Sequence, residues 1–235
     1  MSATEISAGL KIMRGSRGDK PLALVTGATG YIGGRLIPEL LAAGYRVRVL
    51  ARNVERLKYQ PWLNDVEVFE GDATNSQAVT ESLKNVDVAY YLLHALMSKN
   101  DFEAKEAELA EIFASSAKSQ KVKRIIYLGG IISSDSALSP HLKSRADTGE
   151  ILRNSGVPTI ELRAGVVIGS GSASFEMLRY LTERLPFMIT PKWLNVRIQP
   201  IAVRDVLRYL VGAAVIDKSI SGHFDIGGPD IFSYK

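Results

Sequence analysis

Residues 22–33 read LALVTGATGYIG, and this stretch decides the fold. A short apolar run ends in three glycines, Gly27, Gly30 and Gly33, with two residues between each pair. An amphipathic stretch, 35–43, follows at once. We therefore predict a strand, a tight turn and a helix in direct succession, which is the context that gives a glycine triplet its meaning.

Each glycine of the triplet has a separate task in such a turn. Gly27 lets the chain turn tightly off the strand, Gly30 lets the backbone approach a pyrophosphate, and Gly33 lets the helix pack on the sheet. The first helical turn then offers free N–H groups and a positive dipole end to phosphate. The alternative is a glycine-rich turn that binds nothing. We predict a dinucleotide site that also includes three residues within or beside the triplet: Thr29, Tyr31 and Ile32.

Apolar runs alternate with helical patterns along most of the chain. The expected strands are 22–26, 46–50, 66–69, 86–93, 124–128, 159–162 and 223–226. The expected helices are 33–43, 75–84, 101–119, 143–155, 174–185 and 203–215. Repeated βαβ units of this kind build a parallel sheet, so we predict an α/β fold of the Rossmann type, a doubly wound parallel β-sheet with helices on both faces.

Three segments bear on domain organisation. Residues 1–19 lack the apolar region of a secretory signal and are expected to form a flexible leader before a single NAD(P)-binding Rossmann domain, 20–235. Segment 169–200 combines a Gly-Ser loop with three prolines, and we expect it to cap the cofactor cleft. The chain stops shortly after the turn at 227–229, so an alternative is that it is the N-terminal cofactor domain of a longer protein.

Composition narrows the classes of function. The chain has 235 residues, of which 46% are hydrophobic, enough for one large domain with a substantial core. Its 29 Lys and Arg are dispersed and only slightly outnumber its 25 Asp and Glu, so nucleic acid is not an expected partner. No apolar run is long enough for a membrane span. Cysteine is absent, which excludes thiol catalysis and fits a cytoplasmic protein.

The end of the second expected strand bears on the choice between NAD and NADP. An acidic residue about 20 residues past the glycines would accept hydrogen bonds from both ribose hydroxyls and select NAD. No acid lies between Arg46 and Val54, and Arg52 stands there instead. A guanidinium group matches a phosphate, so we predict NADP(H) over NAD(H), with Arg35 and Arg56 as helpers. The alternative is an ordinary solvated arginine.

Two further strand ends should reach the cofactor. Asp72 follows the third strand and, with the N–H of Ala73, could hold the adenine amino group. Alternatively, Asp72 caps the next helix, a place that Thr74 or Asn75 could also fill. The fourth expected strand ends in three residues that should pass under the adenosine ribose and the pyrophosphate: Leu92, Leu93 and His94. The three histidines of the chain lie far apart, so we expect no metal site.

Together these pieces resemble the short-chain dehydrogenases/reductases (SDRs). More narrowly, they are similar to the atypical and extended branch that holds NmrA-like proteins, NAD-dependent epimerase/dehydratase-like proteins and isoflavone-reductase-like enzymes. The likeness covers residues 21–230. The segments that carry it are 26–33, 71–72, 124–130, 144–152, 161–165 and 203–206. The resemblance implies a nicotinamide cofactor and a reaction of the oxidoreductase or epimerase type.

The chain departs from that family at its catalytic residues. Active members use Tyr-x-x-x-Lys, in which the Tyr exchanges a proton and the Lys holds the nicotinamide ribose, with a Ser or Thr at the end of the fifth strand. Matching on Ser144 places His141 at the Tyr position and Arg145 at the Lys position. The hydroxyl position falls on Gly129 or Gly130. The resemblance thus makes His141 the candidate acid or base, since histidine titrates near neutrality, and Arg145 a ribose or phosphate contact. Alternatively, His141 is simply exposed.

Two functions remain open at this point. One is an enzyme that reduces or isomerises a small, partly apolar substrate, as apolar residues of the expected cap suggest: Met177, Phe187, Met188 and Trp193. The other is a non-catalytic module of the NmrA-like type that senses NADP(H) and signals to a regulatory partner protein. Ser133 and Ser134 could replace the missing hydroxyl only in part. The resemblance also implies that a homodimer could form through the helices near 101–119 and 143–155.

Overall fold

The computed structural model describes seven stretches of the chain: 20–94, 102–132, 139–172, 175–176, 179–180, 183 and 197–233. The expected leader lies outside these residues, as does most of the expected cap. Six residues singled out in the sequence also fall outside them: Ser133, Ser134, Met177, Phe187, Met188 and Trp193.

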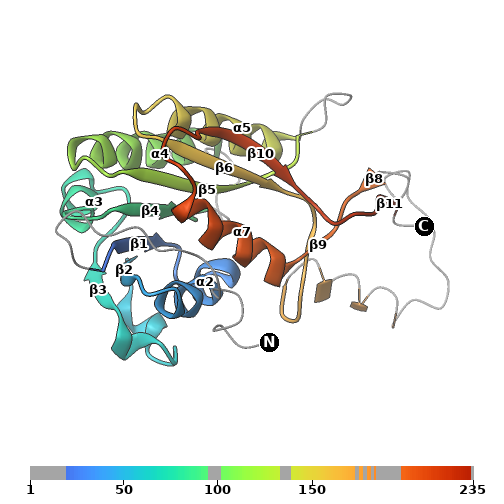
Figure 1. Cartoon of the computed structure of the whole chain (residues 1–235), viewed down its shortest axis with the longest axis horizontal. Coiled ribbons are helices and arrows are strands. Elements are labelled where there is room, and N and C mark those ends of the chain that lie inside the picture. The colour runs from blue at the N-terminus through green and yellow to red at the C-terminus, as the bar shows by residue number, and fades with distance from the viewer. Residues whose placement is uncertain are drawn as a thin grey trace.

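Seven parallel strands form the central sheet, in the order β10-β6-β5-β4-β1-β2-β3 (Figure 1). Their bounds are β1 (Leu22–Thr26), β2 (Arg46–Ala51), β3 (Glu67–Glu70), β4 (Val88–Tyr91), β5 (Arg124–Gly130), β6 (Thr159–Ala164) and β10 (Gly222–Ile226). The strand order reverses between β1 and β4, which is the switch point where α/β sheets of this kind bind ligands. The predicted Rossmann fold is confirmed.

Helices cover both faces of the sheet (Figure 1). Their bounds are α2 (Tyr31–Ala42), α3 (Ser76–Ser82), α4 (Phe102–Ser119), α5 (Pro140–Arg153) and α7 (Val203–Val215), with two short 3₁₀ helices at Val54–Leu57 and Leu63–Asp65. One core cluster joins the sheet to α2 and α7, and the second joins it to α3, α4 and α5. None of the described helices is long and apolar enough to cross a bilayer.

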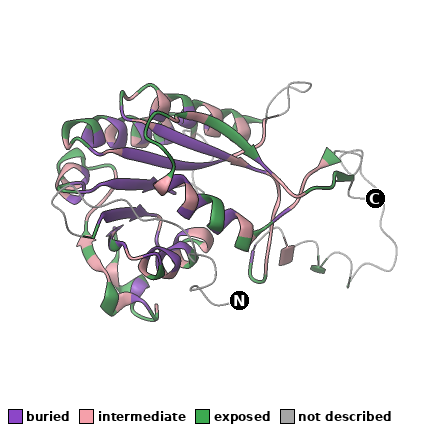
Figure 2. Ribbon diagram, viewed as in Figure 1, coloured by how far each residue is buried: buried purple, intermediate pink, exposed green. Residues whose placement is uncertain are grey.

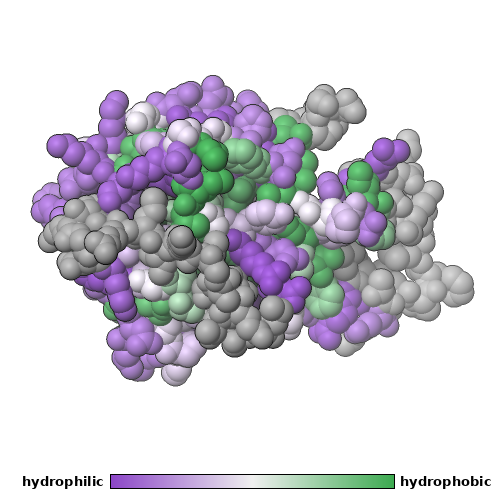
Figure 3. Space-filling model, in the orientation of Figure 1, coloured by the Kyte–Doolittle hydropathy of each residue, from purple (hydrophilic) through white to green (hydrophobic). Residues whose placement is uncertain are grey.

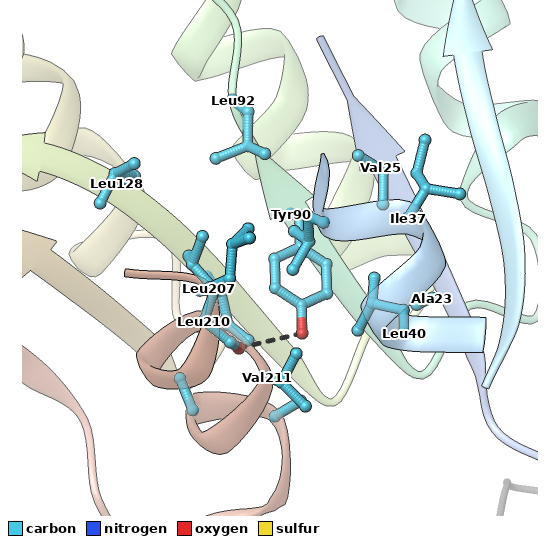
Figure 4. Packing of buried hydrophobic residues seen from close by; sticks show 14 of the residues in the cluster. Ala23, Val25, Ile37, Leu40, Tyr90, Leu92, Leu128, Leu207, Leu210 and Val211 are labelled. Carbon is cyan, nitrogen blue, oxygen red and sulfur yellow. Dashed lines mark hydrogen bonds between the residues drawn. The ribbon is translucent and has the colours of Figure 1, made fainter. Parts of the chain in front are cut away.

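The central strands are buried on both faces, as parallel strands require (Figure 2). On β4, Tyr91 packs edge to face against Phe113 of α4, while Tyr90 points to the opposite face. There the Tyr90 ring lies between α2 and α7, and its hydroxyl donates a hydrogen bond to the Leu210 carbonyl at 3.1 Å (Figure 4). These two tyrosines, and Tyr127 of β5, are core residues.

Element boundaries shift slightly from the predictions. The fourth strand spans Val88–Tyr91 rather than 86–93, so the three residues expected at its end continue beyond it as irregular chain. Helix α5 begins three residues earlier than predicted, because Ser139 caps it by accepting a hydrogen bond from the Leu142 N–H and Pro140 suits the first turn. Four two-residue strands were too short for any periodicity to predict: β7 (Val167–Ile168), β8 (Arg197–Ile198), β9 (Ile201–Ala202) and β11 (Phe232–Ser233).

Strand β10 closes one edge of the sheet and is the least covered strand. Its three middle residues are exposed, and Phe224 keeps 41% of its surface accessible. On the face drawn in Figure 3, hydrophobic residues reach the surface along β10 and the nearby end of α7. The candidate site lies elsewhere, at the carboxyl ends of β1, β4 and β5 near the middle of the sheet.

Candidate functional site

The glycine turn after β1 is shaped by close backbone packing at two of its three glycines. Gly27 has φ +68°, and a Cβ on it would lie 2.4 Å from the Leu92 carbonyl oxygen. A Cβ on Gly33 would lie 2.3 Å from the Gly27 carbonyl oxygen. A Cβ on Gly30 would meet only that same oxygen, at 3.1 Å. Gly27 and Gly33 are therefore required by packing, whereas Gly30 leaves open space above the turn.

That open space faces the N-terminus of α2. The helix begins at Tyr31, and its N-cap residue Gly30 has no side chain with which to cap it. The first intrahelical bond runs from the Gly34 N–H to the Gly30 carbonyl, so the N–H groups of residues 31–33 have no helical acceptor. Thr29 is exposed beside them. Free N–H groups, a dipole and clearance over Gly30 fit a pyrophosphate.

A buried threonine joins the ends of β1 and β4. The Thr26 hydroxyl donates to the Tyr90 carbonyl at 2.9 Å and accepts from the Leu92 N–H at 3.0 Å. This link continues the strand pairing past the end of β4 and holds Leu92 beneath Gly27. Sequence reasoning missed this role, although a hydroxyl residue directly before the glycine turn is a readable signal.

At the other end of the site, β2 and β3 bring Arg52 and Asp72 together. The two side chains approach to 3.8 Å, and Arg52 is 76% exposed. Asp72 does not cap α3. It accepts hydrogen bonds from the Thr74 N–H at 2.9 Å and hydroxyl at 2.8 Å, while Asn75 caps the helix. The Thr74 N–H lowers the pKa of Asp72 most, against the opposing effect of burial, and the Thr74 hydroxyl and Arg52 lower it further.

Past the end of β4, His94 meets Arg145 of α5. Arg145 Nη2 lies 3.2 Å from His94 Nε2. Because a guanidinium group can only donate, the His94 Nε2 must accept, and its ring proton sits on Nδ1. Burial, then Arg145, then His141 lower the pKa of His94 to about 3, so the ring is neutral at physiological pH. The structure thus brings together two predicted site residues that are 51 positions apart in the chain.

His141 lies on the exposed first turn of α5. Its ring stacks on Phe102 of α4, with centroids 5.5 Å apart. It is close enough to His94 for its charge to contribute to the lowered pKa there. Its assignment as acid or base stays a prediction.

The two glycines at the end of β5 have different surroundings. A Cβ on Gly129 would lie 3.1 Å from Oε1 of Glu161, a carboxylate that is only 1% exposed. A Cβ on Gly130 would lie 3.9 Å from Arg145 Nη1. Of the two candidate positions for the family's hydroxyl, Gly130 is therefore the one that opens beside Arg145.

Glu161 belongs to a buried charge cluster that sequence reasoning missed. It pairs with Arg163 at 2.9 Å and with Arg153 of α5. A Cβ on Gly149 would lie 2.6 Å from either carboxylate oxygen, so α5 can cover Glu161 only because Gly149 lacks a side chain. This cluster fixes α5, and with it Arg145, against the sheet. Among the described residues, no group of three or more His, Asp or Glu could hold a metal ion.

The loop after β7 is clasped to the first turn of α2. The Tyr31 hydroxyl and Arg35 Nη2 both donate to the Ser170 carbonyl, at 3.2 and 3.1 Å. The Arg35 guanidinium lies 3.9 Å from the centre of the Tyr31 ring. Arg35, which was expected to help bind the ribose phosphate, is thus engaged with the loop.

Fold and site together define a dinucleotide-binding Rossmann protein of the SDR type. The family model described as NAD(P)H-binding matches residues 27–172, more than half of the chain, and the chain belongs to this family. Its cofactor is therefore a nicotinamide dinucleotide. The match includes the glycine turn, Arg52, Asp72, His94 and Arg145.

Similar curated proteins include mitochondrial subunits of NADH dehydrogenase and NADH-ubiquinone oxidoreductase, and several reductases. The chain is 26% identical, over 90% of its length, to NADH dehydrogenase [ubiquinone] 1 alpha subcomplex subunit 9, mitochondrial, of Arabidopsis thaliana. It is 25% identical, over 96% of its length, to the mitochondrial NADH-ubiquinone oxidoreductase 40 kDa subunit of Neurospora crassa. The chain spans 55% and 61% of the lengths of these two relatives. It is also 25% identical, over 70% of its length, to 52% of a ceramide reductase of Caulobacter vibrioides.

Solved structures share the fold. An epimerase of Methanothermobacter thermautotrophicus matches 92% of this chain and 74% of its own, with a TM-score of 0.76 and 17% identity. The Bordetella bronchiseptica enzyme WbmG, in complex with NAD, matches 93% of this chain and 76% of its own, with a TM-score of 0.74 and 19% identity. At these identities the likeness establishes the fold alone.

Proposed function

We propose that this chain is an NADP(H)-dependent oxidoreductase of the atypical SDR type that reduces or isomerises a small, partly apolar carbonyl compound. The observation that carries the NADP preference is the exposed Arg52 at the end of β2, where an NAD-selective fold has an acid. Its partner Asp72 is itself partly exposed, and such surface pairs are weak, about 0–1 kcal/mol, so a phosphate can displace it.

The rest of the cofactor would follow the switch point of the sheet. The free N–H groups at the start of α2 would bind the pyrophosphate, and Asp72 with the Ala73 N–H would bind the adenine. Ala73 is half-buried in the turn that follows β3. The residues that we assign to the cofactor are Gly27, Thr29, Gly30, Tyr31, Ile32, Gly33, Arg52, Asp72, Ala73, Leu92, Leu93, His94 and Arg145.

At the nicotinamide end, Arg145 would hold the ribose as the family lysine does, and His141 would exchange the proton of the reaction. When bound, the nicotinamide ring donates or accepts a hydride. A guanidinium group is a hydrogen-bond donor only and is not used as a general acid or base, and the pKa of His94 is too low for that ring to carry a proton. Among the residues that the structure describes around this pair, His141 is therefore the group suited to proton exchange.

The test is calorimetric titration of the chain with NADPH and NADH, repeated on two variants. Arg52→Ala removes the proposed phosphate contact. Arg46→Ala is the matched control, because Arg46 is an exposed, ion-paired arginine at the opposite end of the same strand. We expect Arg52→Ala to weaken NADPH binding about tenfold or more, the loss of one charge-assisted contact, and to leave NADH unchanged. Equal effects of both variants, or tighter binding of NADH by the wild type, would reject the NADP assignment.

A second function, an NADP(H) sensor without turnover, is favoured by one observation. Neither Gly129 nor Gly130 offers the Ser or Thr hydroxyl that SDR enzymes use. At the position matched to their tyrosine, this chain has His141. A sensor would bind NADPH and NADP with different affinities and consume neither. NADPH oxidation with a panel of carbonyl compounds, measured on wild type and His141→Ala, separates the two. Turnover that His141→Ala abolishes supports the enzyme, whereas tight binding without turnover supports the sensor.

A further inference from the structure

The charge of Arg145 has no counterpart among the residues that the structure describes. Its side-chain partner there is the neutral His94, and its Nε is buried without a hydrogen-bond acceptor. A half-buried guanidinium that lacks an anion is unfavourable, because most of its hydration is lost and nothing replaces it. Arg163, on the same face of the sheet, shows the contrast, since Glu161 neutralises it at 2.9 Å.

One position beside Arg145 has no side chain. A Cβ on Gly130, at the end of β5, would lie 3.4 Å from Leu142 Cδ2 and 3.9 Å from Arg145 Nη1, both ordinary contacts. His94 Nε2 accepts from Arg145 Nη2 and so positions the guanidinium group. Arg145 Nη1 therefore faces a position without a side chain, and a guanidinium group is well suited to bind a carboxylate.

We infer that Arg145, held in place by His94, forms an anion-binding pocket beside the nicotinamide site, and that the substrate is a carbonyl compound that carries a carboxylate group. This inference deepens the proposed function and rests on it for the position of the substrate. A ribose hydroxyl alone would not neutralise Arg145, because it carries no charge. The carboxylate would anchor the substrate while its apolar part extends away from the donors.

The charged form of His94 is not needed for this pocket. The titratable and charged groups that act on His94 are Arg145 and His141, both cations when protonated, and burial and these two keep the pKa of His94 low. A bound carboxylate would raise that pKa by supplying the opposite charge. The ring would still be neutral at pH 7 and would still accept from Arg145, since the starting value is about 3.

Acetate tests the pocket directly, because it is small enough to enter whatever the rest of the substrate looks like. The buried Nε–H of Arg145 should give a resolved signal in a ¹H–¹⁵N spectrum of the full chain. The spectrum of Arg145→Gln identifies that signal by its absence. The Nε–H of Arg163, already bonded to Glu161, is an internal control. Acetamide is the neutral probe of the same shape. Titrations are made with and without NADP, whose own binding is measured in the same samples.

We expect acetate to shift the Arg145 signal saturably while acetamide and the Arg163 signal do not respond. In Arg145→Gln, acetate binding followed by the His94 ring signals should weaken about tenfold or more. NADP binding should weaken less, because Arg145 supplies only one of the many proposed cofactor contacts. Equal responses to acetate and acetamide, or no saturable shift, would overturn the inference. So would a loss of NADP affinity in Arg145→Gln without a loss of acetate. If Arg145→Gln does not fold, Arg145→Lys and His94→Gln replace it.

The outcomes also separate this inference from the proposed function. If wild-type protein binds acetate but neither NADPH nor NADP, the cofactor proposal fails and the pocket stands. If it binds NADP and shows no acetate response, the pocket fails and the cofactor proposal stands.

Discussion

Gly33→Ala is the sharpest test of the physical account of the cofactor turn. Alanine is normally the better residue inside a helix, by about 1 kcal/mol over glycine. At this position, however, the added Cβ would lie 2.3 Å from the Gly27 carbonyl oxygen and 2.9 Å from its carbon. Both are backbone atoms, which cannot rotate away as the end of a side chain can. The turn itself must therefore move.

The size of the effect follows from that clash. Overpacking of a tight site costs about 1–3 kcal/mol. Moving the Gly27 carbonyl also weakens its 2.9 Å hydrogen bond with the Gly30 N–H, a loss of about 1 kcal/mol that offsets the gain in helix propensity. We expect Gly33→Ala to lower the free energy of unfolding by about 1–3 kcal/mol. Displacement of the N–H groups at the start of α2 should weaken NADPH binding about tenfold or more.

Gly212 of α7 provides the matched control. It is also a helical glycine, but a Cβ there would meet no atom within 4 Å. Gly212→Ala should therefore raise the free energy of unfolding by about 0.5–1 kcal/mol and leave cofactor binding unchanged. Urea denaturation gives both stabilities, and calorimetric titration gives the affinities. If the two variants change stability in the same direction, or if Gly33→Ala binds NADPH normally, the close-packing account of the turn is wrong.

Two further predictions concern ionisable side chains away from the surface. Arg124 is buried and donates hydrogen bonds to the carbonyls of Ala213, Ile216 and Asp217 at the end of α7. In Arg124→Met these carbonyls lose their donor, so the free energy of unfolding, measured by urea denaturation, should fall by about 2–5 kcal/mol. The pKa of His94 is about 3 in the folded protein and about 6.5 in the unfolded chain. Between these two pH values the unfolded chain binds a proton on His94 that the folded protein does not bind. The stability of the wild type should therefore fall as the pH drops from about 6.5 to about 3. His94→Gln should flatten this acid limb, by up to about 1.4 kcal/mol per pH unit, and an unchanged slope would contradict a buried, neutral ring.

Local sequence patterns predicted most of the fold. The main strands and helices were found close to their observed positions, because an apolar strand, a glycine turn and an amphipathic helix are each encoded within about a dozen neighbouring residues. The need for glycine at 27 and 33 was predicted, since it arises largely within the same strand-turn-helix unit. The exception is the carbonyl of Leu92, which reaches Gly27 from the chain just past β4 and is not visible in the local pattern.

Short pairings between distant segments escaped prediction. Strands such as β7 and β9 are two residues long, and what forms them is the approach of chain segments more than 30 positions apart. The start of α5 was predicted three residues too late in the chain. Ser139 and Pro140 precede any apolar periodicity, and they indicate the helix only through capping.

The candidate site likewise has features that local sequence predicts and contacts that only the tertiary structure creates. The amino-acid sequence by itself determined the glycine turn and the absence of an acid after β2, because each of these is a property of residue type at a local spacing. It also predicted, through the family resemblance, that His141 and Arg145 stand at the family's Tyr and Lys positions. Only the tertiary structure decided that Arg145 meets His94, that Glu161 fills the space beside Gly129, and that Arg35 is engaged with Ser170. Those contacts join residues 32 to 135 positions apart, and they exist because parallel strands bring their carboxyl ends together at one edge of the sheet.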